Sequence, residues 1–164
     1  MKFSFSQFIL QSLIFLWISL VVLPPIFFKF ELENIARYMY VFFSTICHQN
    51  EYLSYHFLGK KIAVCSRCFA IYFSFFIGTF FYSLKIFDKK KISFPYVFIF
   101  AIPMCLDFLF GNLNLYFGLK TVHEIYFRPI TGSIFGFAIA IPLLPLMNDT
   151  ISQILNKIIC KKNH

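Results

Sequence analysis

Side chains that could bind a metal ion or act as nucleophiles are concentrated in one short segment of the chain. Cys65 and Cys68 form a C-x-x-C pattern, and Cys47, His48 and His56 precede it. Thiolates and imidazoles are the donors that zinc and other soft transition metals prefer in proteins. Since much of the remaining chain is apolar, we expect any chemistry to lie in this segment.

The spacing of these residues predicts a metal site. Cys65 and Cys68 stand at the start of a long apolar run, and side chains three residues apart share one face of a helix. The positive end of that helix and the neighbouring Arg67 favour the thiolate, which is the form that binds metal. Cys47 and His48 then complete a tetrahedral set of three sulfurs and one nitrogen.

The fourth donor of this set has an alternative. Cys47 and His48 are adjacent in the chain, which is an awkward arrangement for two ligands of one ion, so His56 could replace His48. Soft donors of this kind point to zinc or iron. Such a centre could be structural and hold the long connection against the helix that begins at Cys65, or it could serve metal sensing or transport.

Thiol redox chemistry is a second interpretation of the same residues. Cys65 would be the exposed nucleophile, Cys68 or Cys47 its resolving partner, and Arg67 would stabilise the thiolate. This plan resembles, in outline, the four-helix membrane enzymes that form disulfides and pass electrons to quinone. A third interpretation is an inert disulfide or a non-catalytic assembly partner, and the protein partner or homo-oligomer is left open.

The composition indicates a membrane protein. The 164 residues are 59% hydrophobic and 22% aromatic, and only 13% are charged. Soluble domains carry about 25% charged residues, so this chain is too apolar for that class. The net charge of +8 comes from basic residues between the apolar runs, which is typical of contacts with anionic lipids and of topology signals. We therefore expect a lipid bilayer and no nucleic acid as partner.

The apolar runs predict an all-α integral membrane bundle of four transmembrane helices in a single domain, residues 1–164. The predicted spans are about 8–28, 65–87, 92–111 and 129–147. The first span should end at Pro24-Pro25, the third near Gly111, and the fourth should begin with Pro129 in its first turn. We also expect an extra interfacial helix at about 34–48, between the first two spans, with Asn34 as a possible N-cap.

Two crossings separate the connection before the second span from the connection before the fourth, so both emerge on the same side of the membrane. The lysines of the short turn between the second and third spans, Lys85 and Lys89–Lys91, favour cytoplasmic termini. The Cys/His site would then lie on the extracytoplasmic face of the cell membrane. His123 and Glu124 share that side and are expected to be ordinary interfacial residues.

Asp107 is an acidic residue inside the third apolar run. It either reaches water from the helix end, roughly 8 Å away, or faces the bundle and pairs with a cation. Arg128, Arg67 and His123 could supply that cation, and Arg128 immediately precedes the fourth span. Within that span, Gly132 and Gly136 form a G-x-x-x-G step, continued by Ala140, that lets two helices approach closely, and Gly78 is expected to serve packing as well.

These residues resemble a known family of uncharacterised prokaryotic membrane proteins, domain of unknown function two-zero-eight-five. The likeness covers roughly Ile46 to Ile141, and it implies a membrane architecture and the Cys/His site but no reaction. Its motifs are C-H-Q, C-x-R-C with a following tyrosine, a proline and an aspartate in the third span, and an arginine followed by glycines at the fourth. In this chain they are Cys47-His48-Gln49, Cys65, Arg67, Cys68, Tyr72, Pro103, Asp107, Arg128, Gly132 and Gly136.

The chain departs from the family's usual pattern in two places. Leu53-Ser54 stands where relatives often have an arginine before the serine. Ala70 and Ser74 stand after C-x-R-C where relatives tend to have glycine. The first departure concerns the geometry of the loop, and the second concerns how closely the helices pack.

Overall fold

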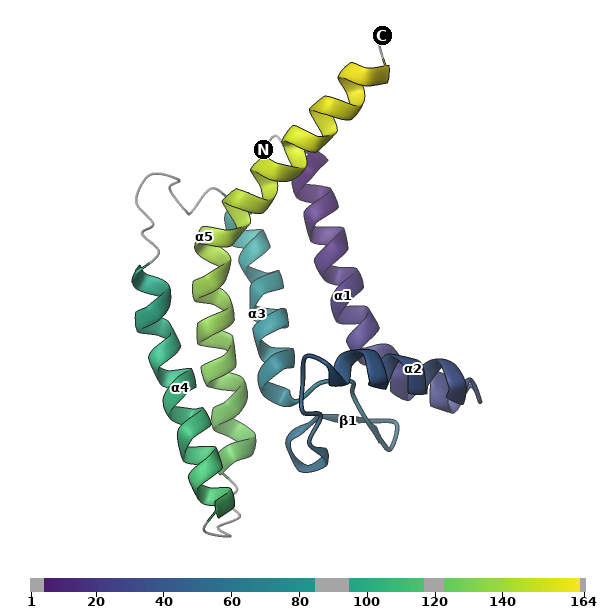
Figure 1. Ribbon diagram of the computed structural model, residues 1–164, viewed down its shortest axis with the longest axis vertical. Helices are drawn as coiled ribbons and strands as arrows, with labels where there is room; N and C mark the ends of the chain where they lie inside the picture. The colour runs from purple at the N-terminus through teal and green to yellow at the C-terminus, as the bar shows by residue number, and fades with distance from the viewer. Residues whose placement is uncertain (1–4, 85–94, 117–122, 163–164) are drawn as a thin grey trace.

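The computed structural model describes residues 5–84, 95–116 and 123–162, with side chains apart from those of 111–116, 123–125 and 159–162 (Figure 1). This part of the chain is almost entirely helical, so the all-α prediction is confirmed. The elements are α1 (Phe5–Lys29), α2 (Glu33–Ser44), a short 3-10 helix η1 (Glu51–Leu53), β1 (His56–Phe57), β2 (Lys60–Lys61), α3 (Ser66–Ser83), α4 (Pro95–Tyr116) and α5 (His123–Lys162). The small antiparallel β1–β2 ribbon was not expected from the sequence.

Two helices within the described chain are long and apolar enough to cross a membrane. They are α1, with a mean hydropathy of 2.2, and the stretch Tyr126–Ile158 of α5, with a mean hydropathy of 1.9. A shorter apolar stretch, Pro95–Phe110, makes up most of α4. The structure therefore supports a helical membrane protein with two clear candidate spans.

Four helices run roughly along the long axis of the molecule, and α2 lies across the end of α1 (Figure 1). The chain alternates in direction along α1, α3, α4 and α5. As a result, the end of α1, α2, the ribbon, the start of α3, the end of α4 and the start of α5 all lie at one end of the molecule. This is the end that carries the candidate site, and the start of α1 and the end of α5 lie at the other.

The proline pair that was expected at the exit of the first span, about 8–28, lies inside the first helix. Pro24 and Pro25 are buried inside α1, which continues to Lys29 and changes direction in its last part (Figure 1). A proline in a helix lacks the N–H that would bond the carbonyl four residues earlier. Here the Val21 carbonyl, left without Pro25 as a donor, accepts the Ala63 N–H at 3.0 Å. The proline pair therefore bends the helix and docks the segment that leads to Cys65.

The last turn of α1 closes in a Schellman motif. The Leu32 N–H bonds the Phe27 carbonyl at 3.0 Å and the Glu31 N–H bonds the Phe28 carbonyl at 3.3 Å, which is the 6→1 and 5→2 pattern of that motif. Glu31 occupies the left-handed position with φ of 59°. This tight reversal is what sets α2 across the end of the bundle.

A helix is present between the first two long helices, as expected, but its predicted bounds of 34–48 were too long. It runs from Glu33 to Ser44, and its N-cap position is Leu32 rather than Asn34, with no side-chain cap. The helix buries Ala36 and Phe43. Beyond it, the Cys47 N–H still bonds the Phe43 carbonyl at 3.0 Å, but the left-handed Gln49 (φ of 47°) turns the chain away.

The helix that was expected as the second span, α3, begins one residue later than expected, and Cys65 occupies its N-cap position. The helix is described as far as Ser83, so the lysines of the predicted short turn, Lys85 and Lys89–Lys91, lie outside the described residues. The helix α3 packs most closely against α5. Gly78 faces Ala140 there, because a Cβ at Gly78 would lie 2.7 Å from the Ala140 Cβ.

The last two helices are longer than expected. The helix α4 continues to Tyr116, past Gly111, because glycine weakens a helix interior without stopping it when helix-favouring residues such as leucine follow. The helix α5 begins at His123, so Pro129 lies inside it and not at its first turn. It also contains Pro142 and Pro145 and changes direction along its length (Figure 1).

Candidate metal centre

The three cysteines of the predicted site come together at the start of α3. Cys47 follows the end of α2, Cys65 is the N-cap residue of α3, and Cys68 lies in its first turn. Their Sγ atoms all lie within 4.8 Å of one another. Tetrahedral zinc with bonds of about 2.3 Å requires sulfurs about 3.8 Å apart, so a small inward movement would suffice to enclose an ion.

The electrostatics of the trio favour a thiolate at Cys47. Hydrogen bonds from the Cys65 and Cys68 side chains lower the pKa of the Cys47 thiol, and the backbone N–H of Cys65 adds to the effect. That N–H lies 3.2 Å from the Cys47 Sγ. The amide belongs to the N-terminus of α3, where unpaired N–H groups stabilise negative charge. The site therefore contains one sulfur prepared to bind a cation.

An apolar cluster surrounds the sulfurs. Cys47 is only 6% exposed, whereas Cys65 and Cys68 are partly exposed. The buried members of the cluster are Val21, Phe43, Cys47, Ile62, Ala63 and Val64, and the residues packed against them include Trp17, Tyr40, Phe69 and Tyr72. Burial of this kind excludes water from one side of the trio and leaves the side of Cys65 and Cys68 accessible.

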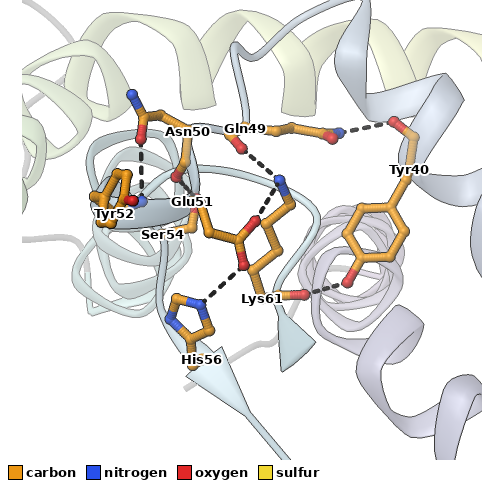
Figure 2. A network of polar contacts seen from close by, with 8 residues as sticks. All are labelled: Tyr40, Gln49, Asn50, Glu51, Tyr52, Ser54, His56 and Lys61. Atoms are coloured by element: carbon orange, nitrogen blue, oxygen red, sulfur yellow. Dashed lines mark hydrogen bonds and ion pairs between the residues drawn. The ribbon is translucent and has the colours of Figure 1, made fainter. Parts of the chain in front are cut away.

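A polar network fixes the loop that carries Cys47 (Figure 2). The Gln49 side-chain amide donates to the Tyr40 carbonyl at 2.7 Å, so it ties the loop after Cys47 to the backbone of α2. The Gln49 carbonyl accepts from Lys61 Nζ at 2.8 Å, and the Tyr40 hydroxyl donates to the Lys61 carbonyl. Gln49 and Lys61 thus join α2 to the β1–β2 ribbon on either side of the loop.

The acidic member of this network is Glu51. Its carboxylate lies 3.1 Å from Lys61 Nζ and 3.3 Å from His56 Nε2 (Figure 2). Hydrogen bonds from Lys61, and then from His56, lower the pKa of Glu51 below its usual value. His56, which the sequence suggested as an alternative metal ligand, is therefore placed beside a carboxylate on the ribbon.

His48 is not brought to the sulfurs. It is exposed, and the described residues that could share one ion are Cys47, Cys65 and Cys68, without a histidine or a carboxylate. Cys47 and His48 are neighbours in an irregular stretch, where adjacent side chains need not point the same way. The fold therefore assembles the sulfur donors of the expected set and leaves its imidazole outside.

Arg67 does not point at the sulfurs either. Its guanidinium pairs with the Asp107 carboxylate of α4, and the two side chains are 9% and 13% exposed. Thr131 of α5 also donates to the same carboxylate, at 3.3 Å. The ion pair thus joins α3, α4 and α5 directly beside the cysteine trio. Because α4 extends to Tyr116, Asp107 lies roughly 14 Å from the helix end, farther than the sequence suggested.

The remaining predicted residues lie near this junction. The cation that the structure places on Asp107 is Arg67, while Arg128 is partly buried one turn before Thr131. His123 and Glu124 belong to the first turn of α5, and their side chains are outside the described set.

The two glycines of the G-x-x-x-G step face α3. A Cβ at Gly132 would lie 2.7 Å from the Arg67 carbonyl, and one at Gly136 would lie 2.4 Å from the Ile71 carbonyl. Ala70 and Ser74, the two departures from the family pattern, are the α3 side chains that meet these glycines. The glycines of α5 therefore still allow α3 and α5 to approach closely in this chain, although α3 has Ala70 and Ser74 in place of glycine.

Sequence reasoning missed two residues that position the site. Gln49 is part of the C-H-Q signature, and only its place in that signature hinted at the anchoring role that the structure shows. Pro25 was interpreted as a helix end, whereas it frees the Val21 carbonyl for Ala63. No sequence signal links Pro25 to Ala63, because the contact joins residues that are far apart in the chain.

The fold and the site together define a class: a helical membrane protein with a partly buried cysteine trio that could hold a metal ion. The chain belongs to the DUF2085 family, described as a predicted membrane protein, which it matches over residues 47–142. The matched region contains the trio, the Arg67–Asp107 pair and both glycines. The resemblance drawn from the C-H-Q and C-x-R-C motifs is thus confirmed at the level of the family.

A relative from an archaeon extends this likeness beyond the matched region. The chain is 32% identical over 149 residues to the uncharacterized protein MJ1492 of Methanocaldococcus jannaschii, and the alignment covers 87% of this chain and 92% of the relative. No solved structure matches the chain. The similarity therefore includes most of α1 to α5 and assigns no activity.

Proposed function

We propose that α1, α3, α4 and α5 form a four-helix transmembrane bundle and that α2 is an interfacial helix. The helix α4 supports this proposal, because none of its described side chains between 95 and 110 is buried. Its exposed residues include Tyr96, Phe98, Ile99, Phe100, Ile102, Leu106, Phe108, Leu109 and Phe110. A continuous apolar surface of this kind is costly in water and favourable in lipid.

The orientation that we propose follows the distribution of lysine. The turn after α3 and the end of the chain are rich in lysine, and such loops stay in the cytoplasm. Both termini would then be cytoplasmic, and the cysteine trio would face the outside of the cell membrane. The position of α2 across the helix ends (Figure 1) supports its place in the interface at the same level as the trio.

At this outer end we propose a metal-binding site. The observation that carries the proposal is the meeting of three sulfurs, from Cys47, Cys65 and Cys68, within 4.8 Å at a helix N-terminus. Zinc and iron are the ions that the residue types suggested from the sequence, and both bind thiolates. The site would hold the α2–α3 connection in place or would pass an ion on, in the manner of a sensor or transporter.

Metal and thiol quantification on one sample of purified protein in detergent tests this function. We expect about one metal ion per chain, because one trio holds one ion, and loss of that ion when Cys65→Ser and Cys68→Ser are combined. Cys105→Ser is the matched control, since Cys105 is an exposed cysteine of α4 outside the trio and should leave the metal content unchanged.

Two other results would contradict the proposal. A Cys65–Cys68 or Cys47–Cys65 disulfide trapped in cells, with no metal bound, would instead support thiol–disulfide redox chemistry. Three free thiols with no metal in any preparation would leave a structural or assembly role for the trio.

A further inference from the structure

The number of donors around the trio limits which ions it suits. In the part of the chain that the structure describes, the group of side chains able to share one ion consists of three cysteines. Zinc in structural sites is almost always held by four protein ligands, and zinc with three keeps water or substrate in the fourth position. A zinc ion bound by the trio would therefore need a fourth ligand that the three cysteines do not supply.

Neither nearby histidine is placed to fill it. His56 belongs to β1, where its backbone pairs with Lys61, and its ring lies 3.3 Å from the Glu51 carboxylate (Figure 2). His48 is exposed, and the next residue, Gln49, is held by bonds to Tyr40 and Lys61. To reach the sulfurs, His48 would have to rotate against a loop that is fixed on its C-terminal side.

The walls of the site disfavour a water ligand on the buried side. The residues packed around Cys47 include Val21, Phe43, Ile62 and Val64, which offer no side-chain hydrogen bond. A buried water usually needs two to four polar partners. An ion that is satisfied by three thiolates has the advantage in these surroundings over one that requires a fourth ligand.

We propose that the trio is a three-coordinate thiolate site for a soft monovalent cation of the Cu(I) type, and that neither His48 nor His56 completes it. This inference rests on the proposed metal-binding function and specifies its ion. Soft sulfur ligands select Cu(I), and Cu(I) is stable with three thiolates in a plane. Cys65 and Cys68 are partly exposed, so an ion can enter and leave on their side while Cys47 holds it from the buried side.

The test uses the full chain purified in detergent under anaerobic conditions, with acetonitrile-stabilised Cu(I) as the probe ion and Zn(II) as the comparison. X-ray absorption of the Cu(I) sample should show three sulfur neighbours and no nitrogen, in one equivalent per chain. Zn(II), if bound, should show the same sulfurs together with an additional oxygen or nitrogen neighbour. The wild-type spectra are decisive without any variant.

Variants give an independent readout by competition with a Cu(I) chelator. His48→Ala and His56→Ala should each keep the Cu(I) affinity within about a factor of two. Cys47→Ser or Cys68→Ser should lower the affinity by more than the roughly 10- to 100-fold that loss of an outer-shell contact causes. Two different cysteine variants are used so that misfolding of one does not decide the result.

The outcomes separate this inference from the function on which it rests. A bound ion with a nitrogen neighbour that disappears in His48→Ala or His56→Ala would overturn the three-coordinate site while the metal centre stands. Cu(I) bound by fewer than three sulfurs would overturn it as well. If neither Cu(I) nor Zn(II) binds in a one-to-one ratio, the inference is wrong, and the proposed function is wrong as well when metal quantification on the same protein finds no iron.

Discussion

Arg67 and Asp107 are the two charged side chains whose burial has the largest consequence for stability. Their side chains are 9% and 13% exposed, and the pair links α3 to α4 beside the cysteine trio. Removing one partner of a buried ion pair leaves the other charge without compensation, whereas replacing both by apolar residues often costs little. The pair therefore makes the junction of helices intolerant of single changes.

We expect Asp107→Asn to lower the free energy of unfolding by about 3–5 kcal/mol, because Arg67 is left buried and unpaired. The combined change Arg67→Met with Asp107→Leu should recover most of that loss. Thermal unfolding in detergent measures both. Glu33→Gln is the matched control, because the Arg37–Glu33 pair is 69% and 57% exposed and such pairs contribute only about 0.3–0.5 kcal/mol. A double variant as unstable as Asp107→Asn would contradict the ion-pair account.

Glu51 makes the folding stability of the protein depend on pH, through the loop that carries Cys47. Its pKa in the folded protein lies below the ordinary value of 4.5, because of hydrogen bonds from Lys61 and His56. A carboxyl with a lowered folded pKa binds fewer protons when folded, so its stabilising effect is present above the unfolded pKa and is lost as the pH falls through the folded pKa.

We therefore expect the wild type to unfold at a higher temperature than Glu51→Gln at about pH 6 and the difference to shrink as the pH falls below the ordinary carboxyl value of 4.5. The unfolding temperatures of the two proteins, measured in parallel over this range, test the prediction. Since Glu51 is 61% exposed, the difference should be small and should shrink with added salt. A constant difference at every pH would show that Glu51 acts through packing and not through charge.

At the scale of elements, the bend in α1 is what holds the segment before the site. Pro25 cannot donate to the Val21 carbonyl, and that carbonyl accepts the Ala63 N–H instead. Ala63 and Val64, which directly precede Cys65, are completely buried. The carbonyl that Pro25 leaves free in α1 thus binds the loop that leads to Cys65, the N-cap residue of α3.

Pro25→Ala should restore a backbone donor for Val21 and deprive the Ala63 N–H of its acceptor. An unsatisfied buried N–H costs about 1–3 kcal/mol, so we expect amide exchange in the 62–65 segment to become roughly ten- to hundredfold faster. Hydrogen–deuterium exchange with mass spectrometry measures this change. Pro24→Ala is the matched control, because it leaves the Val21 carbonyl to Ala63. Equal protection in both variants would refute the role of Pro25.

For the whole molecule, the alternation of α1, α3, α4 and α5 places the trio at one end and both chain termini at the other (Figure 1). In the four-helix bundle that we propose, α3 and α4 both cross the bilayer, so the connection after α1 and the start of α5 lie on one side of it. This arrangement explains how α3, α4 and α5 contribute Arg67, Asp107 and Thr131 to one junction.

Four crossings predict that an epitope inserted at Gly59 and one fused after the last residue lie on opposite sides of the membrane. Gly59 is the turn of the exposed β1–β2 ribbon, with no atom within 4 Å of a Cβ built there, so an insertion should be tolerated. Protease digestion should remove the Gly59 epitope from spheroplasts and the C-terminal epitope only from inverted vesicles. Both epitopes on one side would rule out the three crossings that the proposed bundle places between Gly59 and the end of the chain.

The sequence by itself determined the helical class, the family and the segment where the sulfurs gather, because hydropathy and the spacing of cysteines are local properties. It also indicated the close approach of α5, since Gly132 and Gly136 are four residues apart on one helix face. It was less successful at helix ends: Pro24, Pro25 and Pro129 all lie inside helices, where tertiary packing overrides local preference.

Only the tertiary structure decided which partners these residues have. It placed Arg67 on Asp107 and not on the sulfurs, kept His48 and His56 outside the trio, and joined the Val21 carbonyl to Ala63. Each of these choices depends on where two distant segments meet and on which competing donor arrives at hydrogen-bonding distance. That outcome follows from the packing of the helices and cannot be deduced from the spacing of residues along the chain.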